Sequence, residues 1–278
     1  MSSAGRAGST GSTGSTGSGH ATDSALSGPP VAQAVRAELA AAADPGHAEF
    51  LAGYFRTGPG GYGEGDVFLG VRIPHVREVA RRHGRAATDD DLAALLADPV
   101  HEHRFAALAV LDGRARAAAR RGPGALEPLA RFYLAHADAV DNWDLVDVSA
   151  PHVLGTWLAT TTAATEPDDG AAARILDGLV ASPSRWRRRI AVMATWAFTR
   201  DGRPGWTLAV AGRLVGERDD LVHKATGWML REVGHRDHAR LLDFLDTHHH
   251  RLARVTVRYA VEKLPPEVRA CYVTRRRE

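Results

Sequence analysis

The stretch Lys224-Ala-Thr-Gly-Trp-Met-Leu230 places one cation before a run of small and apolar residues, a pattern typical of a packed helix. The leading cations of this stretch and of three similar ones lie 85, 35 and 34 residues apart. A helix expected after Asn142 would divide the longest interval into two steps of about 42 residues, close to the period of helix-pair solenoids. The alternative is that Ala-rich helical sequence resembles itself by chance. The other three stretches are Arg104-Phe-Ala-Ala-Leu-Ala-Val-Leu111, Arg189-Ile-Ala-Val-Met-Ala-Thr-Trp196 and Arg258-Tyr-Ala-Val-Glu-Lys-Leu264.

The rest of the chain also reads as helical. Pro74 predicts a helix that ends near His83, and Thr88 followed by three aspartates predicts the capped start of another. No sustained two-residue alternation flanked by hairpin turns is present, so strands are not needed. We therefore predict an all-α fold, an α-solenoid superhelix of HEAT-like helical repeats, in which the second helix of each pair lines the concave side.

Composition sets the domain organisation. Residues 1–30 are rich in Gly, Ser and Thr, which predicts a disordered tail, and residues 31–278 are predicted to form one repeat domain. The tail lacks the basic and apolar regions of a signal peptide, and no apolar run is long enough to span a membrane. The single cysteine, Cys271, excludes an intrachain disulfide and fits a reducing cytoplasm. We expect a cytoplasmic monomer in which Cys271, Trp157, Trp196 and Trp206 are packing residues.

The net charge is only +2, yet arginines gather in two clusters that suit an anionic partner. The clusters are Arg185, Arg187, Arg188 and Arg189, and Arg251, Arg254 and Arg258.

The central stretch Asn142-Trp-Asp-Leu-Val-Asp147 carries the main candidate site. Asn142 is a good N-cap, and Trp143 and Asp147, four residues apart, share one helix face. An indole beside a carboxylate offers a flat apolar wall and a fixed negative charge. The alternative is that Trp143 packs in a core and both aspartates stabilise a helix start. Asp144 is expected to point away from the face that carries Asp147.

Other motifs carry less chemistry. The segment Gly58–Gly65 lacks the Lys-Ser/Thr of a phosphate-binding P-loop, and no strand precedes it, so we interpret it as a helix connection that can touch a ligand backbone. His248-His-His250 cannot all face one ion on a helix and reads as a solvated turn. His101-Glu-His103 lacks the spacing of a helical zinc pair. We expect no metal and no cofactor.

Four separated motifs, in order, resemble the AlkD-like DNA glycosylases, also called DNA alkylation repair enzymes, over residues 47–272. The resemblance implies a HEAT-like α-solenoid that excises cationic 3-methyladenine and 7-methylguanine types from duplex DNA without flipping the base into a pocket. Compared with one enzyme of this family, this sequence differs at Asn142, where that enzyme has a second tryptophan, at Arg72, where it has glutamine, and in the Gly58–Gly65 insertion. The motifs are Phe68-Leu-Gly-Val-Arg-Ile-Pro74, Asn142–Asp147 with Pro151, Trp186-Arg-Arg-Arg189 and Lys224-Ala-Thr-Gly-Trp-Met-Leu-Arg-Glu232.

By motif position, the resemblance implies a catalytic cleft formed by Trp143, Asp147, Arg189 and Trp228. A purine alkylated at N3 or N7 is already a good leaving group, so one carboxylate suffices to stabilise the sugar cation. Asp147 is that carboxylate, the two indoles face a cation, and Arg189 can orient Asp147 or bind a phosphate. The residues expected to contact double-stranded, alkylated DNA are Lys224, Arg258, Tyr54, Arg72 and Arg231.

Two other classes of protein remain open. One is a non-catalytic HEAT-repeat scaffold that binds nucleic acid or protein, because this fold is commonly an interaction platform. The other is a DNA binder that has lost excision. The joint presence of two tryptophans, a carboxylate and an arginine in the cleft motifs argues against both.

Overall fold

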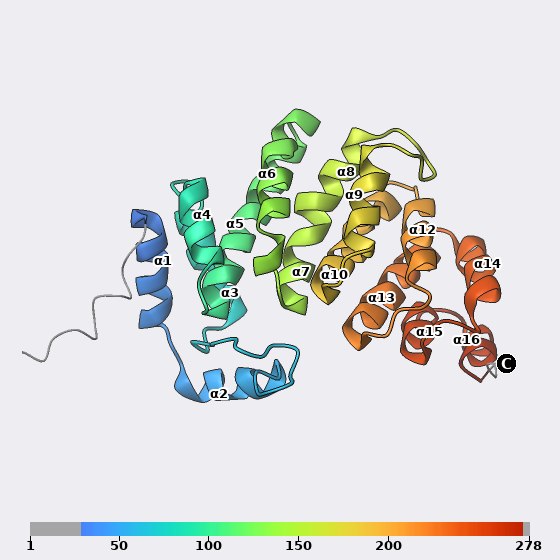
Figure 1. Ribbon diagram of the computed structural model, residues 1–278, viewed down its shortest axis with the longest axis horizontal. Helices are drawn as coiled ribbons and strands as arrows, with labels where there is room; N and C mark the ends of the chain where they lie inside the picture. Colours follow the sequence, from blue (N-terminus) through green and yellow to red (C-terminus); the bar gives the residue numbers. More distant parts are fainter. Residues whose placement is uncertain (1–28, 275–278) are drawn as a thin grey trace, which may run out of the picture.

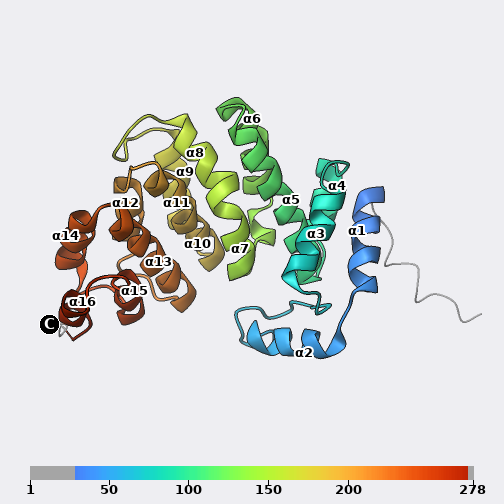
Figure 2. The same ribbon diagram turned by 180° about the vertical axis from the view of Figure 1, so that it is seen from behind.

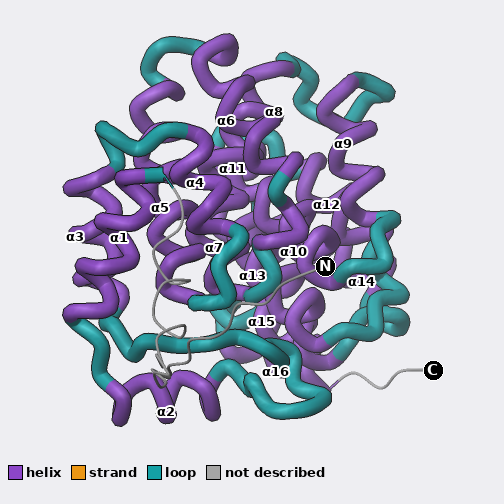
Figure 3. The backbone as a smooth tube through the Cα atoms, turned by 60° about the vertical axis from the view of Figure 1, so that its left-hand side comes forward, coloured by secondary structure: helices purple, strands orange, loops and turns teal. Residues whose placement is uncertain are grey.

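The computed structural model describes residues 29–274, and the regular structure in this range is helical apart from one isolated bridge between Val67 and Val100 (Figure 3). The all-α prediction is confirmed. The tail predicted for residues 1–30 lies outside the described residues except for Pro29 and Pro30, and Pro30 begins the first helix. No helix within residues 29–274 combines the length and apolarity needed to cross a membrane.

The helices form a solenoid with an inner and an outer row (Figures 1 and 2). Each inner helix packs on the next, and the helix after Asn142 lies between the Arg104 and Arg189 helices, as the repeat spacing predicts. The inner helices are α3 (Ile73–His83), α5 (His101–Ala119), α7 (Trp143–Ala150), α10 (Arg185–Ala194), α13 (Asp220–Arg236) and α15 (Arg254–Ala260). The remaining helices of the solenoid are α1 (Pro30–Ala41), α4 (Asp89–Leu96), α6 (Pro123–Ala135), α8 (Thr156–Thr161), α9 (Ala171–Val180), α11 (Trp196–Arg200), α12 (Gly205–Arg213), α14 (His238–His248) and α16 (Pro266–Thr274).

One helix stands apart from the stack. Helix α2 (Pro45–Tyr54) buries none of its residues and lies across the ends of the inner row (Figures 1 and 2). It is tied to the start of α3 through Gly70, whose carbonyl lies 2.6 Å from Nδ1 of His47. Gly70 has φ +83°, and a Cβ there would lie 2.1 Å from the carbonyl oxygen of Asp44. Only glycine fits this approach of two backbones.

Local signals set where several helices begin. The cap predicted at Thr88 is confirmed, and the side chains of Thr88 and Asp91 form a reciprocal capping box at the start of α4. Pro74 lies in the first turn of α3, where its missing N–H costs nothing. The side chain of Asn142 accepts a hydrogen bond from the backbone N–H of Trp143 at 2.8 Å, which confirms it as the cap of α7.

Helix α7 continues through a π-helical turn, η3 (Pro151–Gly155), into α8. Pro151 has no N–H to donate to the carbonyl of Asp147 four residues earlier, so the regular helical ladder is interrupted one turn after that aspartate. Gly155 then allows α10 to approach, because a Cβ there would lie 2.3 Å from the carbonyl oxygen of Ala194. The turn thus fits α7 closely against α10.

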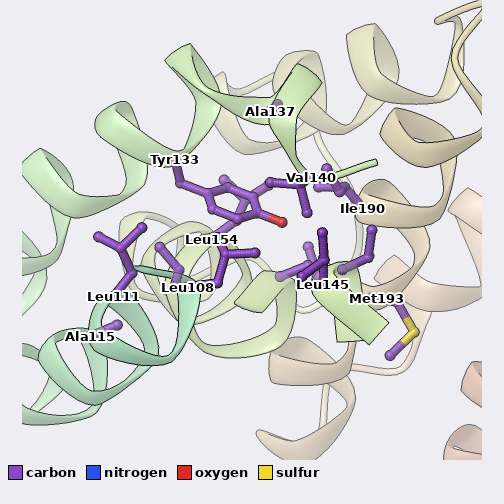
Figure 4. Close-up of a cluster of buried hydrophobic side chains, with 14 of the residues drawn as sticks. Leu108, Leu111, Ala115, Tyr133, Ala137, Val140, Leu145, Leu154, Ile190 and Met193 are labelled. Atoms are coloured by element: carbon purple, nitrogen blue, oxygen red, sulfur yellow. The ribbon is translucent and has the colours of Figure 1, made fainter. Parts of the chain in front are cut away.

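The central core lies between α5, α6, α7, η3 and α10, where residues such as Leu108, Tyr133, Leu145 and Ile190 interlock (Figure 4). A smaller cluster joins α13 to α14, α15 and α16.

The tryptophan predictions hold in part. Trp157 and Trp206 are buried, while Trp196 is half-buried at the edge of the core.

One prediction for the C-terminal repeat was wrong, and another holds in part. Cys271 is exposed, because α16 buries only Tyr272. The turn predicted at the three histidines is present and His250 is exposed, but His249 is buried, with Nε2 2.8 Å from the carbonyl oxygen of Tyr272.

Candidate functional site

An open cleft of about 710 Å³ runs along the inner row, between the loop after α2 and helices α7, α10, α13 and α15. The chain folds so that residues more than 200 positions apart line one surface, from Tyr54 to Tyr259. The lining residues are Tyr54, Arg56, Gly60, Gly61, Tyr62, Trp143, Asp147, Arg185, Arg189, Asp219, Asp220, Leu221, Lys224, Trp228 and Tyr259.

Asp147 is held in the cleft by a two-pronged ion pair with Arg189 of the next inner helix. Nε of Arg189 donates to Oδ1 at 3.0 Å and Nη2 donates to Oδ2 at 2.7 Å. The third guanidinium nitrogen donates to the backbone carbonyl of Leu221 on α13. Because Arg189 is buried and its donors are engaged, it orients the carboxylate rather than reaching out to a phosphate.

The environment of Asp147 changes its acidity. Its side chain is 17% exposed, and burial raises the pKa of Asp147 above the ordinary range. The guanidinium of Arg189 opposes this rise in the pKa, while the nearby carboxylate of Asp144 adds to it. The result is a desolvated carboxylate on the wall of an open cleft, which is typical of functional sites.

Aromatic rings frame this carboxylate. Trp143 stacks on Phe55 with ring centroids 5.3 Å apart and meets the edge of Tyr54 at 6.2 Å. Trp228 lines the cleft from α13, and its indole N–H donates to Glu232 at 3.2 Å. Trp143 therefore packs against a neighbour and still lines the cleft, so both interpretations of this residue hold in part.

Comparison with known proteins shows which family this arrangement belongs to. The family model described as DNA alkylation repair enzyme matches residues 35–264, which is most of the chain. The chain belongs to this family. A solved structure described as a predicted DNA alkylation repair enzyme from Enterococcus faecalis superposes with a TM-score of 0.58 at 14% identity, over 81% of this chain and 97% of that chain. At this identity the likeness shows the fold. Among curated proteins, no significant sequence match is found.

The predicted DNA-contacting residues of this DNA alkylation repair family member separate into two groups. Tyr54 and Lys224 line the cleft, although Nζ of Lys224 lies 2.7 Å from a carboxylate oxygen of Asp220. Exposed pairs of this kind are weak, so a phosphate can compete with Asp220.

Arg72, Arg231 and Arg258 do not line the cleft. Arg72 is exposed at the start of α3, and Arg231 is paired with Glu262. Arg258 lines a neighbouring hollow beside Tyr272, because successive helical residues point about 100° apart and Tyr259 takes the cleft side of α15.

The first arginine cluster is also less basic than its sequence suggests. Each of its members meets a carboxylate: Arg185 with Asp219, Arg187 with Asp138, Arg188 with Glu217 and Arg189 with Asp147. Charge clustering along the sequence therefore overestimates the free positive charge of this surface.

A buried polar network supports the start of α7. Oδ2 of Asp66 accepts a hydrogen bond from the side-chain amide of Asn142 at 2.8 Å. The two ring nitrogens of His101 lie 3.1 Å from Asp66 and 2.8 Å from Asp144. Asp144 does not line the cleft, but it lines a neighbouring hollow together with Asp147, so the prediction that it points away from the face of Asp147 was wrong. It is a partner in this network rather than a residue that acts only at a helix start. Asn142 thus joins α7 to Asp66, which directly follows the Gly58–Gly65 segment.

Several residues that line the cleft were not predicted from the sequence, notably Arg56, Tyr62 and Tyr259. Gly60 and Gly61 of the glycine-rich segment line the cleft, and contact of this segment with a ligand stays a prediction. Among the described residues, no group of histidine, cysteine and carboxylate side chains is arranged to hold a metal ion.

Proposed function

We propose that this DNA alkylation repair family member is a monofunctional DNA glycosylase that removes positively charged N3- and N7-alkylated purines from duplex DNA. One observation carries the proposal: a desolvated carboxylate, Asp147, is oriented by Arg189 on the wall of an open cleft framed by Trp143 and Trp228.

The chemistry needs little more than this carboxylate. The cationic purine leaves without protonation, so no general acid is required. The sugar that remains develops positive charge, and a fixed negative charge in a partly dry site stabilises it more than water does. The same carboxylate can hold the attacking water, a task that ordinary glycosidases divide between two carboxylates.

The indoles contribute through their negative ring faces. A cation over tryptophan gains about 0.5–2 kcal/mol, depending on how dry the site is. The cleft runs along the inner helix row and is bounded by four separate helices, which suits a DNA strand better than a single extruded base. We therefore propose excision without insertion of the base into a closed pocket.

A non-catalytic scaffold gains nothing from the Asp147–Arg189 pair. Burying a charge pair often stabilises a protein no more than apolar side chains of the same volume do. The proposed glycosylase reaction gives this pair a role, because the reaction needs a fixed carboxylate that faces the cleft.

Incubation with methylated duplex DNA tests the proposal directly. We expect release of free 7-methylguanine and 3-methyladenine above the spontaneous rate, measured by chromatography of the released bases. If the protein binds the duplex but releases neither base, it is a DNA binder without excision activity, and the proposal is wrong.

The acidity of Asp147 predicts how excision depends on pH. The carboxylate acts in its ionised form, so the rate should be full at neutral pH and fall as pH drops through its pKa. Because burial raises that pKa, the fall should begin at a higher pH than for an ordinary aspartate. Single-turnover rates at a series of pH values, corrected for spontaneous depurination, measure this fall in rate. Arg189→Gln removes the positive charge that opposes the rise in the pKa of Asp147, so the fall in rate should begin at a still higher pH. If the fall stays at the same pH, another group titrates.

A further inference from the structure

Among the charged side chains that line the cleft, one cation has no carboxylate to balance it. Its cations are Arg56, Arg185, Arg189 and Lys224, and its carboxylates are Asp147, Asp219 and Asp220. Each carboxylate is paired with one cation: Asp147 with Arg189, Asp219 with Arg185 at 2.8 Å and Asp220 with Lys224 at 2.7 Å. Within residues 29–274, no carboxylate lies within ion-pair distance of Arg56. The positive charge of the cleft therefore comes from this residue.

The backbone presents Arg56 in a strained conformation. Its φ is +53°, and among the described residues no other non-glycine residue has a positive φ. Side chains disfavour this region, and such strain is retained where it places a functional group. The turn leads directly from α2 into the Gly58–Gly65 segment and directs Arg56 into the cleft that Lys224 also lines.

The glycine-rich segment packs closely against the backbone of that turn. A Cβ on Gly61 would lie 1.7 Å from the carbonyl oxygen of Arg56, and one on Gly63 would lie 2.5 Å from that of Phe55. The hydroxyl of Tyr62 donates to the carbonyl of Tyr54 at 3.0 Å. The ring of Tyr62 lies 5.9 Å below the guanidinium of Arg56, which leaves the nitrogens of that group free for a ligand.

We propose that Arg56 binds a backbone phosphate of the DNA and that residues 56–65 form a clamp holding one strand against Trp143 and Asp147. An arginine without a carboxylate partner, on an aromatic ring and in a cleft whose other charges are balanced, suits an anion that the protein itself does not supply. The inference rests on the proposed DNA glycosylase function and assigns a role to the Gly58–Gly65 segment.

Binding of a labelled, undamaged duplex at several salt concentrations tests the clamp. Arg56→Gln should lower the affinity about tenfold at low salt and reduce the slope of log affinity against log salt by about one, because one phosphate contact is lost. Arg121→Gln is the matched control: Arg121 is exposed, and it does not line the cleft. Its affinity and slope should equal those of the wild type.

Arg56→Gly separates binding from folding. Glycine adopts a positive φ without strain, so the thermal midpoint should stay the same or rise while the affinity falls as in Arg56→Gln. Wild-type affinity and slope in both Arg56 variants would overturn the inference, and so would an equal loss in Arg121→Gln.

Release of 7-methylguanine distinguishes this inference from the proposed function. If the wild type releases the base and the Arg56 variants bind normally, only the clamp fails. If the wild type releases no base but the Arg56 variants lose affinity and slope, the phosphate contact stands without the glycosylase.

Discussion

Asp147→Asn is expected to slow excision of 7-methylguanine about 100- to 1000-fold, because it removes the charge that faces the developing sugar cation. The substitution keeps the size of the side chain, so the cleft should still bind the duplex. The measurement is single-turnover release of the base, with binding of the duplex followed separately.

The ion pair adds a stability effect to this prediction. Asp147→Asn leaves the buried guanidinium of Arg189 without its negative partner, which should lower the free energy of unfolding by about 3 kcal/mol. The double variant Asp147→Asn/Arg189→Gln replaces the charges with two amides that can hydrogen-bond. It should recover part of the stability but none of the excision. Recovery of excision along with stability would mean that Asp147 acts through the fold rather than on the substrate.

The control for Asp147 must be another aspartate paired with arginine. Asp144 is unsuitable, because its carboxylate lies 2.8 Å from Nε2 of His101 in the buried network. Asp138 is suitable: it pairs with Arg187 at 2.8 Å, and its side chain is 81% exposed. Asp138→Asn should excise at the wild-type rate, and a slow Asp138→Asn would show that charge anywhere near α7 affects the assay.

Glu102→Ala is expected to lower the free energy of unfolding by about 3 kcal/mol or more, because it leaves three backbone N–H groups without an acceptor. The carboxylate of Glu102 is buried and accepts from Leu69 at 3.0 Å, Gly70 at 2.8 Å and Val71 at 3.2 Å. Stability of a domain this size is itself only about 5–15 kcal/mol. Denaturant unfolding followed by circular dichroism measures the loss.

Two further variants sharpen this prediction. Glu102→Gln keeps one acceptor oxygen and should cost less, about 1–3 kcal/mol. Glu127→Ala removes an exposed glutamate that pairs with Arg131 one turn away, and should cost about 0.5 kcal/mol or less. If Glu102→Ala were no worse than Glu127→Ala, the segment before α3 would not depend on this carboxylate.

Loss of the Glu102 carboxylate should also affect excision in the cleft. The segment that it holds directly follows Phe68, whose ring stacks on Phe55 at 4.9 Å, and Phe55 in turn stacks on Trp143. Excision by the folded fraction of Glu102→Ala should therefore be slower than that of the wild type.

Much of the fold follows from local sequence features. The proline at the start of α3 and the capping box of α4 act within a few residues, so their patterns could be recognised without tertiary information. The repeat spacing placed α7 between its neighbours, because each helix of a solenoid packs mainly on the next. That Trp143 and Asp147 share a face is also a local feature, because a four-residue separation places two side chains on one side of a single helix.

What only the tertiary structure decided is which partner each charged group meets. Arg189 pairs with an aspartate 42 residues earlier, and Asp144 turns into a network with His101, because the rotation of each helix about its axis depends on how neighbouring helices pack. The same rotation turns Tyr259 rather than Arg258 toward the cleft. Sequence shows that arginines are abundant, but only the packed helices show that Arg56 meets no carboxylate among residues 29–274, since a charge is neutralised by groups near it in space and not in the chain.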